Sequence, residues 1–216
     1  YNIDSMLKFI ALIGIIIISI LYIYFRKTVL FYQNKDIVII HPFYPNNYFR
    51  KIMKYCIDID NKLVKDSRVN SRKTYMCDSQ KDQFIYKQIF SNYFYKQIKK
   101  TLNINSCKPS VFPIEYRKYD TGSQGMNWHQ DKPIFKDPYY ECVLTLTNDS
   151  DSNFEFMIDD TIHTVQPKPN SLILVKPNTV YHKVTPLQIG ERRILKFVFL
   201  LGDNEESEHY VFESKI

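Results

Sequence analysis

Hydrophobic and polar residues follow three successive patterns along this chain of 216 residues. A long apolar run, whose one charged residue is Lys8, comes first, near the start. Stretches with helical spacing follow, in which apolar residues recur every three or four positions. From about residue 110 the period falls to two, in short segments separated by turn residues. This order predicts a helical region followed by a β-rich domain.

The apolar run spans residues 6–25 and reads MLKFIALIGIIIISILYIYF. Its length matches the roughly 20 residues that a helix needs to cross a bilayer core of about 30 Å. Arg26 and Lys27 follow it, whereas a cleaved signal peptide would end in a site of small residues. We therefore expect an N-terminal flank at 1–5, a single transmembrane anchor at 6–25 and a juxtamembrane linker at 26–35.

Residues 36–110 are expected to form a helical support region. A short β run at 36–41 opens this region, and helical spacing covers residues 46–57 and 82–102. The stretch 58–80 between the two helices is polar, and we expect it to be irregular. Lysines near the end of the second helix suit that position, because the helix dipole favours cations there.

The β-rich domain, residues 111–216, contains about eight predicted strands divided by turn signals such as Thr121-Gly122 and Ile189-Gly190. The strands lie near residues 111–119, 126–131, 141–147, 153–158, 161–165, 171–175, 180–184 and 192–201. So many short strands with close turns predict a mainly β fold, either a sandwich or a double-stranded β-helix (jelly roll).

The net charge of +6 is unevenly spread, with an excess of basic residues before position 115 and of acidic residues after it. Attraction of the basic half to anionic lipid explains this distribution as well as nucleic acid does. Basic residues after the anchor favour a cytosolic C-terminal domain, and a domain in the ER lumen is the alternative. The four cysteines lack CxxC or zinc spacing, so we expect free thiols.

The stretch NWHQD, Asn127 to Asp131, carries the first candidate chemistry. His129 and Asp131 are two residues apart, so on a strand both side chains point the same way and could hold one divalent metal ion. For this motif alone, a surface histidine–aspartate pair is the alternative interpretation. A third ligand elsewhere in the chain would decide between them.

His182, in VYHKVTP, is the candidate third ligand, and Arg192 follows it by ten residues. Two imidazoles and one carboxylate make the facial triad of non-haem Fe(II) oxygenases, which leaves coordination positions open. An arginine that points into the same pocket needs an anionic partner, because an unpaired buried guanidinium is costly. A dicarboxylate bound to the metal at one end and to Arg192 at the other would satisfy both needs.

With these motifs the sequence resembles the Fe(II)/2-oxoglutarate dioxygenases of the prolyl 4-hydroxylase-like group. The matching pieces are YDTG at 119–122, HQD at 129–131, VQPKPNSLILV at 165–175 and HKVTPLQIGER at 182–192. The resemblance covers roughly residues 36–201, and it is strongest over residues 114–199. It implies a double-stranded β-helix core that hydroxylates its substrate.

The resemblance also implies roles for single residues. Iron would be bound by His129, Asp131 and His182, and the distal carboxylate of 2-oxoglutarate by Arg192. Further candidates are Tyr119, Thr145 or Thr147 and Lys196 in the co-substrate pocket. Trp128 and Tyr181 are candidates for walls beside the metal ligands, with ordinary aromatic core residues as the alternative interpretation. The implied reaction uses Fe(II), 2-oxoglutarate and O2, with ascorbate as a reductant, and it yields succinate and CO2.

One departure from the family pattern leaves the substrate class open. The family's second tyrosine, usually just before the HxD motif, is missing, and Met126, Asn127 and Trp128 stand there. We expect a protein or peptide side chain as substrate, with proline the leading residue. A nucleic-acid base is the alternative, because WHQDK also resembles alkylation-repair dioxygenases, although the acidic C-terminal half suits phosphate contacts poorly. A non-enzymatic, membrane-anchored jelly-roll protein is a second alternative.

Overall fold

The computed structural model describes residues 29–67 and 70–202. The expected flank at 1–5, the expected anchor at 6–25 and the end of the expected β-rich domain, residues 203–216, lie outside these residues. Within the described part of the chain, no helix is long and apolar enough to span a membrane.

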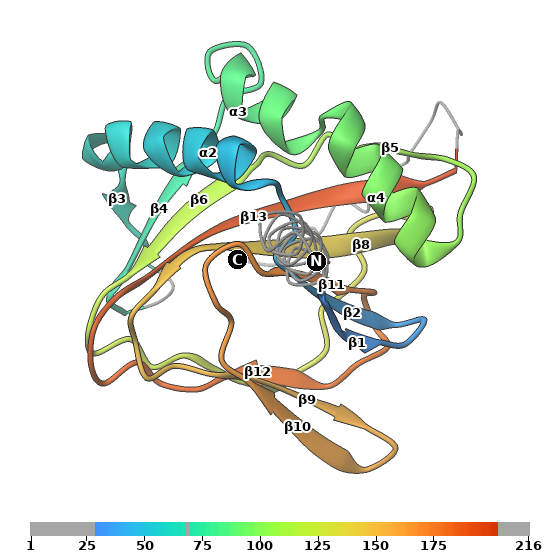
Figure 1. The fold of residues 1–216 in the computed structure, drawn as a ribbon. Coiled ribbons are helices and arrows are strands. Elements are labelled where there is room, and N and C mark those ends of the chain that lie inside the picture. Colours follow the sequence, from blue (N-terminus) through green and yellow to red (C-terminus); the bar gives the residue numbers. More distant parts are fainter. Residues whose placement is uncertain (1–28, 68–69, 203–216) are drawn as a thin grey trace, which may run out of the picture.

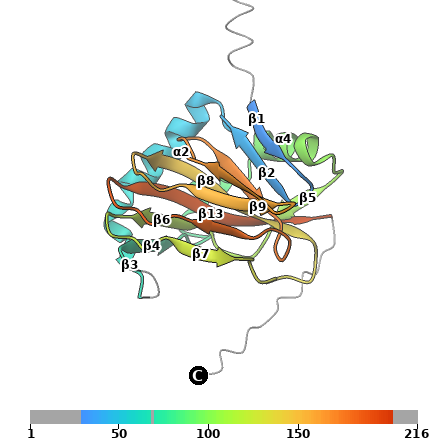
Figure 2. The same cartoon turned by 90° about the horizontal axis from the view of Figure 1, so that it is seen from below.

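Antiparallel strands form two sheets that face each other (Figures 1 and 2). The larger sheet has the order β1 (Val29–Gln33), β2 (Ile37–His41), β11 (Leu172–Val175), β8 (Tyr139–Asn148), β13 (Arg192–Leu201), β6 (Glu115–Tyr119), β4 (Arg72–Met76) and β3 (Val64–Lys65), and β5 (Cys107–Pro109) pairs with β13. The smaller sheet has the order β10 (Thr161–Val165), β9 (Phe154–Ile158), β12 (His182–Val184) and β7 (Met126–His129). Two facing antiparallel sheets are the architecture of a jelly roll, as the sequence predicts.

Three helices cover the outer face of the larger sheet (Figure 1). They are α2 (Asn46–Asp58), α3 (Gln83–Ile89) and α4 (Asn92–Leu102), and the short 3-10 helix η1 (Asp60–Lys62) follows α2. The helices bury apolar faces, including Ile52, Ile85 and Phe94, against the sheet in the largest hydrophobic core. A second core between the two sheets consists of Ile37, Ile39, Phe154, Phe156, Ile173, Val175 and Val180.

The central strand β13 is buried on both of its faces, because the helices cover one side and the smaller sheet lies across the other. Leu195 and Phe197 belong to the core under the helices. Arg192, Ile194 and Lys196 point the opposite way and line a pocket between the sheets. Strand alternation therefore brings charged side chains into the interior of the jelly roll, where the candidate site lies.

The expectation of one helix over residues 82–102 is wrong, because the segment forms two helices, α3 and α4. The hydroxyl of Ser91 accepts a hydrogen bond from the backbone N–H of Phe94, so Ser91 caps the start of a new helix. Helix α4 then ends at Leu102, and the next residue, Asn103, adopts the left-handed conformation common at helix C-termini.

The expectation of an irregular stretch at 58–80 is also wrong. This stretch contains η1, β3 and β4, and β4 extends the larger sheet beyond β6. The hydrophobic pattern missed β4 because two of its buried residues, Arg72 and Thr74, are polar. Arg72 is buried as an ion pair with Asp66. Strands β1 and β5 likewise lie where the pattern predicted none.

Candidate metal and co-substrate site

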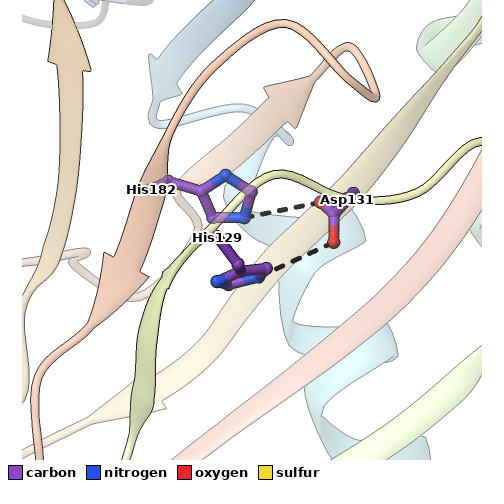
Figure 3. Close-up of side chains that lie close together, drawn as sticks. All are labelled: His129, Asp131 and His182. Atoms are coloured by element: carbon purple, nitrogen blue, oxygen red, sulfur yellow. Dashed lines mark ion pairs between the residues drawn. The ribbon is translucent and has the colours of Figure 1, made fainter.

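His129 and His182 face each other across neighbouring strands of the smaller sheet. The register of β7 and β12 pairs His129 directly with His182, so the two imidazoles point to the same side. The centroids of their rings are 4.4 Å apart. Asp131 follows β7 by two residues and turns its carboxylate toward both rings (Figure 3). The three predicted metal ligands therefore converge at one point.

The distances within this triad suit a metal ion. The Nε2 atom of His182 lies 3.4 Å from Oδ2 of Asp131, and the Nε2 atom of His129 lies 3.8 Å from Oδ1. The three potential ligand atoms all lie within 4.8 Å of one another. Two imidazoles and one carboxylate are the donor set of a facial triad, which leaves positions open for other ligands.

Backbone carbonyl groups hold both imidazoles in the orientation that metal binding requires. The Nδ1 of His129 lies 2.7 Å from the carbonyl oxygen of Asn127, and the Nδ1 of His182 lies 3.0 Å from that of Val180. Each Nδ1–H can therefore donate to a carbonyl, and each Nε2 keeps its lone pair toward Asp131. The Nε2 of His129 is buried and has no hydrogen-bond partner, as expected for an atom that binds a metal.

Burial lowers the pKa of His182, and the nearby Asp131 carboxylate opposes this effect only in part. The neutral imidazole is the form that binds a metal ion. The environment of His182 therefore favours the protonation state that metal binding needs. Together with the donor set, this shows that the residues fit a divalent cation.

A pocket of about 590 Å³ between the sheets connects the triad to several buried charges. Its lining comprises Arg117, Tyr119, Met126, His129, Asp131, Glu141, Val143, Phe154, Ile173, Val175, His182, Val184, Arg192, Ile194 and Lys196. All three metal ligands and Arg192 thus share one cavity, as the sequence predicts. A smaller cavity of about 300 Å³ adjoins it and shares Tyr119, Met126, Val184 and Arg192.

Arg192 is the one cation in this pocket without a carboxylate partner among the described residues. Its side chain is only 5% exposed, and its Nε has no hydrogen-bond partner. The guanidinium lies over the ring of Tyr119, 5.6 Å from the ring centroid. Burial lowers the pKa of Arg192, although arginine remains charged at neutral pH. A buried, unpaired guanidinium in a pocket calls for an anionic ligand.

Two further cations in the pocket do have carboxylate partners. Arg117 forms an ion pair with Glu115 on the same strand. Lys196 on β13 forms an ion pair of 2.5 Å with Glu141 on the neighbouring strand β8. Burial raises the pKa of Glu141, and the Lys196 charge opposes that rise. Sequence reasoning considered Lys196 but missed Arg117 and Glu141. Glu141 had a signal, a charge within an otherwise apolar stretch of β8, whereas Arg117 lies among other charged residues in β6.

The other predicted site residues take different positions. Tyr119 lines the pocket, whereas Thr145 is fully buried and is not part of the lining. The hydroxyls of Thr145 and Thr147 are both buried without a hydrogen-bond partner. Tyr181 is 52% exposed and also lies outside the lining.

Trp128 precedes His129 on β7, and its side chain therefore points to the opposite face of the strand. There the Lys183 ammonium lies 5.0 Å from its ring centroid, and Lys183 forms an ion pair with Glu155. Trp128 therefore contacts the outer face of the smaller sheet and does not line the pocket that contains the triad.

Sequence comparison finds no matching family model and no matching curated protein. Solved structures, in contrast, are similar. An oxidoreductase of the 2OG-Fe(II) oxygenase family from Burkholderia pseudomallei matches with a TM-score of 0.62 and 12% identity, over 80% of this chain and 89% of that one. The chain has the fold of the 2OG-Fe(II) oxygenases.

Two more structures of this fold extend the comparison. A prolyl-4-hydroxylase from Pseudomonas putida matches with a TM-score of 0.58 and 17% identity, over 78% of this chain and 94% of that one. HygX from Streptomyces hygroscopicus, solved with nickel and 2-oxoglutarate bound, matches with a TM-score of 0.60 and 12% identity, over 84% and 85% of the two chains. The fold expected from the resemblance to prolyl 4-hydroxylase-like dioxygenases is therefore confirmed.

Proposed function

We propose that this protein is an Fe(II)- and 2-oxoglutarate-dependent dioxygenase that hydroxylates its substrate. The observation that carries the proposal is the buried guanidinium of Arg192, which has no carboxylate partner among the residues that the structure describes and lines the same pocket as the triad. A metal site alone has many uses, but a metal site and an unpaired cation in one pocket suit a ligand with two negatively charged ends. 2-Oxoglutarate is such a ligand.

The residues of the chain have distinct tasks in this reaction. His129, Asp131 and His182 hold the metal, and the carbonyls of Asn127 and Val180 fix the imidazole orientation. Arg192 binds the far carboxylate of 2-oxoglutarate and so fixes the direction in which the co-substrate lies. Apolar side chains around the pocket exclude water from the reaction.

The bound metal and 2-oxoglutarate supply the oxidation itself: one atom of O2 enters 2-oxoglutarate, which leaves as succinate and CO2, and the other enters a C–H bond of the substrate. We propose ascorbate as the reductant that restores Fe(II) after unproductive turnover. The protein contributes binding, orientation and a dry site.

For the substrate, we propose a protein or peptide side chain, with a prolyl residue first. The similarity to a prolyl-4-hydroxylase structure supports this choice. We also propose that residues 6–25 anchor the enzyme in a membrane with a single pass and a cytosolic catalytic domain. The support for the anchor is its apolar length and the basic residues that follow it.

The test is succinate formation by the purified protein with Fe(II), ascorbate and 2-oxoglutarate. Proline-rich peptides and methylated oligonucleotides are supplied in separate reactions. We expect the peptides to stimulate succinate formation and His129→Ala to abolish it. His163→Ala is the matched control, because His163 stacks on Phe156 in the same sheet but does not line the pocket.

Other outcomes would revise the proposal in defined ways. Stimulation by methylated oligonucleotides alone would favour a nucleic-acid demethylase. Equal succinate formation by His129→Ala and the wild type would contradict the assignment of the metal site. An absence of 2-oxoglutarate binding to the metal-loaded wild type would leave a non-enzymatic jelly-roll protein as the better description.

A further inference from the structure

One of the two ion pairs at the pocket between the sheets has both of its members in the pocket lining, and metal and 2-oxoglutarate binding do not explain it. Glu141 and Lys196 both line the pocket, on neighbouring strands of the larger sheet. The oxygen Oε2 of Glu141 lies 2.5 Å from the Lys196 ammonium. Glu141 is only 7% exposed, so the charge of its carboxylate must be compensated by a nearby cation and not by water, and Lys196 is that cation.

The pair lines the same pocket as the metal ligands. The Asp131 carboxylate acts electrostatically on both Glu141 and Lys196, and the charge of Lys196 acts in turn on His182. Burial alone would lower the pKa of Lys196, but Glu141 raises it above its ordinary value. Lys196 is therefore a charged ammonium in the pocket that contains the metal ligands.

We propose that Glu141 determines how many carboxylates a ligand of this pocket can carry. It neutralises Lys196, so that Arg192 is the one cation of the pocket without a carboxylate partner among the described residues. The proposal rests on the proposed function and adds the selectivity of the co-substrate site to it. Without Glu141, Lys196 would offer a third anchor for negative charge, beside the metal and Arg192.

The charge balance of the pocket supports this role. Arg117 is matched by Glu115, Lys196 by Glu141, and Asp131 compensates half the charge of a divalent metal. Arg192 and the remaining metal charge then require a dianion. A trianion in the same place would leave one negative charge buried without compensation, which is strongly unfavourable in a site of low dielectric.

The experiment compares two simple ligands that differ by one carboxylate, glutarate with two and tricarballylate with three. Calorimetry on the full chain, loaded with Mn(II), measures how strongly each ligand competes with 2-oxoglutarate. In Glu141→Gln we expect the ratio of tricarballylate affinity to glutarate affinity to rise about tenfold, the effect of one charge-assisted hydrogen bond. In Lys196→Gln we expect the ratio to fall and 2-oxoglutarate itself to bind more weakly.

Glu155→Gln is the matched control. Glu155 also pairs with a lysine on a neighbouring strand, Lys183, but it does not line the pocket. This variant should keep the wild-type ratio. The double variant Glu141→Gln/Lys196→Gln should also return to that ratio, because it removes both charges. A purely structural role of the pair would instead lower the affinity for both ligands equally.

The results separate this proposal from the proposed function. If the Mn(II)-loaded wild type binds no 2-oxoglutarate, the proposed function and this inference both fail. If it binds 2-oxoglutarate and Glu141→Gln leaves the ratio unchanged, only the inference is overturned. If Glu141→Gln does not fold, Lys196→Gln and the double variant test the inference. The inference is overturned if the ratio of tricarballylate affinity to glutarate affinity does not fall in Lys196→Gln, or if it does not return to the wild-type value in the double variant.

Discussion

At the scale of single residues, the candidate site depends on a few buried polar atoms that have no hydrogen-bond partner within residues 29–67 and 70–202. The Nε2 of His129 and the Nε of Arg192 are both buried without a hydrogen-bond partner. Such groups are costly in a folded protein unless a ligand satisfies them. The two atoms lie on opposite sheets and line one pocket, so a single ligand–metal unit can satisfy both.

Arg192 and Arg193 offer a test at this scale, because adjacent residues of one strand face opposite sides. Arg192→Met should weaken 2-oxoglutarate binding to the Mn(II)-loaded protein by about two orders of magnitude, since a buried charge-assisted pair is worth roughly 2–5 kcal/mol. Arg193→Met should bind 2-oxoglutarate like the wild type, because Arg193 pairs with Asp60 outside the pocket. Calorimetry without O2 measures both. Equal losses in the two variants would contradict the role of Arg192.

The lowered pKa of His182 predicts a pH dependence of stability in the metal-free protein. Between this lowered pKa and the ordinary value near 6.5, the unfolded chain binds more protons than the folded one. The free energy of unfolding is therefore undiminished above about pH 6.5, and it falls as the pH drops from there to the lowered pKa of His182, below which this group causes no further loss. Chemical denaturation at pH 7.5 and 5.5 should show that the free energy of unfolding falls more between these two pH values in the wild type than in His182→Asn. Parallel losses would argue against a buried neutral imidazole.

At the scale of elements, the triad depends on the pairing of two short strands, β7 and β12. Gly125 precedes β7 at a φ of +68°, and a Cβ there would lie 2.2 Å from the carbonyl oxygen of Val184 on β12. Only glycine allows the two backbones to approach so closely. The distance between His129 and His182 therefore depends on a residue that does not itself bind the metal.

Gly125→Ala should consequently separate the strands and weaken both stability and metal binding. We expect a loss of more than about 3 kcal/mol, because backbone strain and a backbone clash add. Gly202→Ala is the control, since Gly202 has a similar φ of +83° but no atom within 4 Å of the added Cβ. Gly202→Ala should lower the free energy of unfolding by only about 1–2 kcal/mol, because an alanine is strained in the left-handed conformation, and it should leave the metal affinity unchanged. Thermal melts and Mn(II) titration distinguish the two variants.

At the scale of the whole molecule, the jelly roll encloses the site between its two sheets. The smaller sheet supplies the two histidines, and the larger sheet supplies Arg192, Lys196 and Glu141. A ligand that contacts both groups holds the sheets together and stabilises the folded state over the unfolded one. The effect of ligands on stability therefore reports on the complete site.

Mn(II) should raise the melting temperature, and 2-oxoglutarate should raise it further only when the metal is present. Each ligand at about 100 times its Kd contributes roughly 2.7 kcal/mol, which corresponds to about 5–10 °C for a chain of this size. EDTA should reverse both shifts, and His129→Ala should show neither. A stabilisation by 2-oxoglutarate that persists in EDTA would contradict a metal-dependent co-substrate site.

The sequence by itself determined the chemical identity of the site and the class of fold. The spacing of His129 and Asp131 fixes their common direction on a strand, and the short strands with close turns indicate two facing sheets. These features are local, because backbone geometry sets the direction of alternate side chains without reference to the rest of the chain. The same alternation indicates that Trp128 and Tyr181 face away from their histidine neighbours, which the sequence interpretation overlooked.

Only the tertiary structure decided which distant residues share the pocket. Glu141 meets Lys196 because of the register between β8 and β13, and β4 joins the sheet through polar residues such as Arg72 that carry no hydrophobic signal. Ser91 divides a helix that has continuous apolar spacing. Each of these outcomes depends on contacts between segments far apart in the chain or on one hydrogen bond at a helix end. The order of residue types alone does not determine strand register or the capping of a helix, because both are set by the free energy of the whole fold.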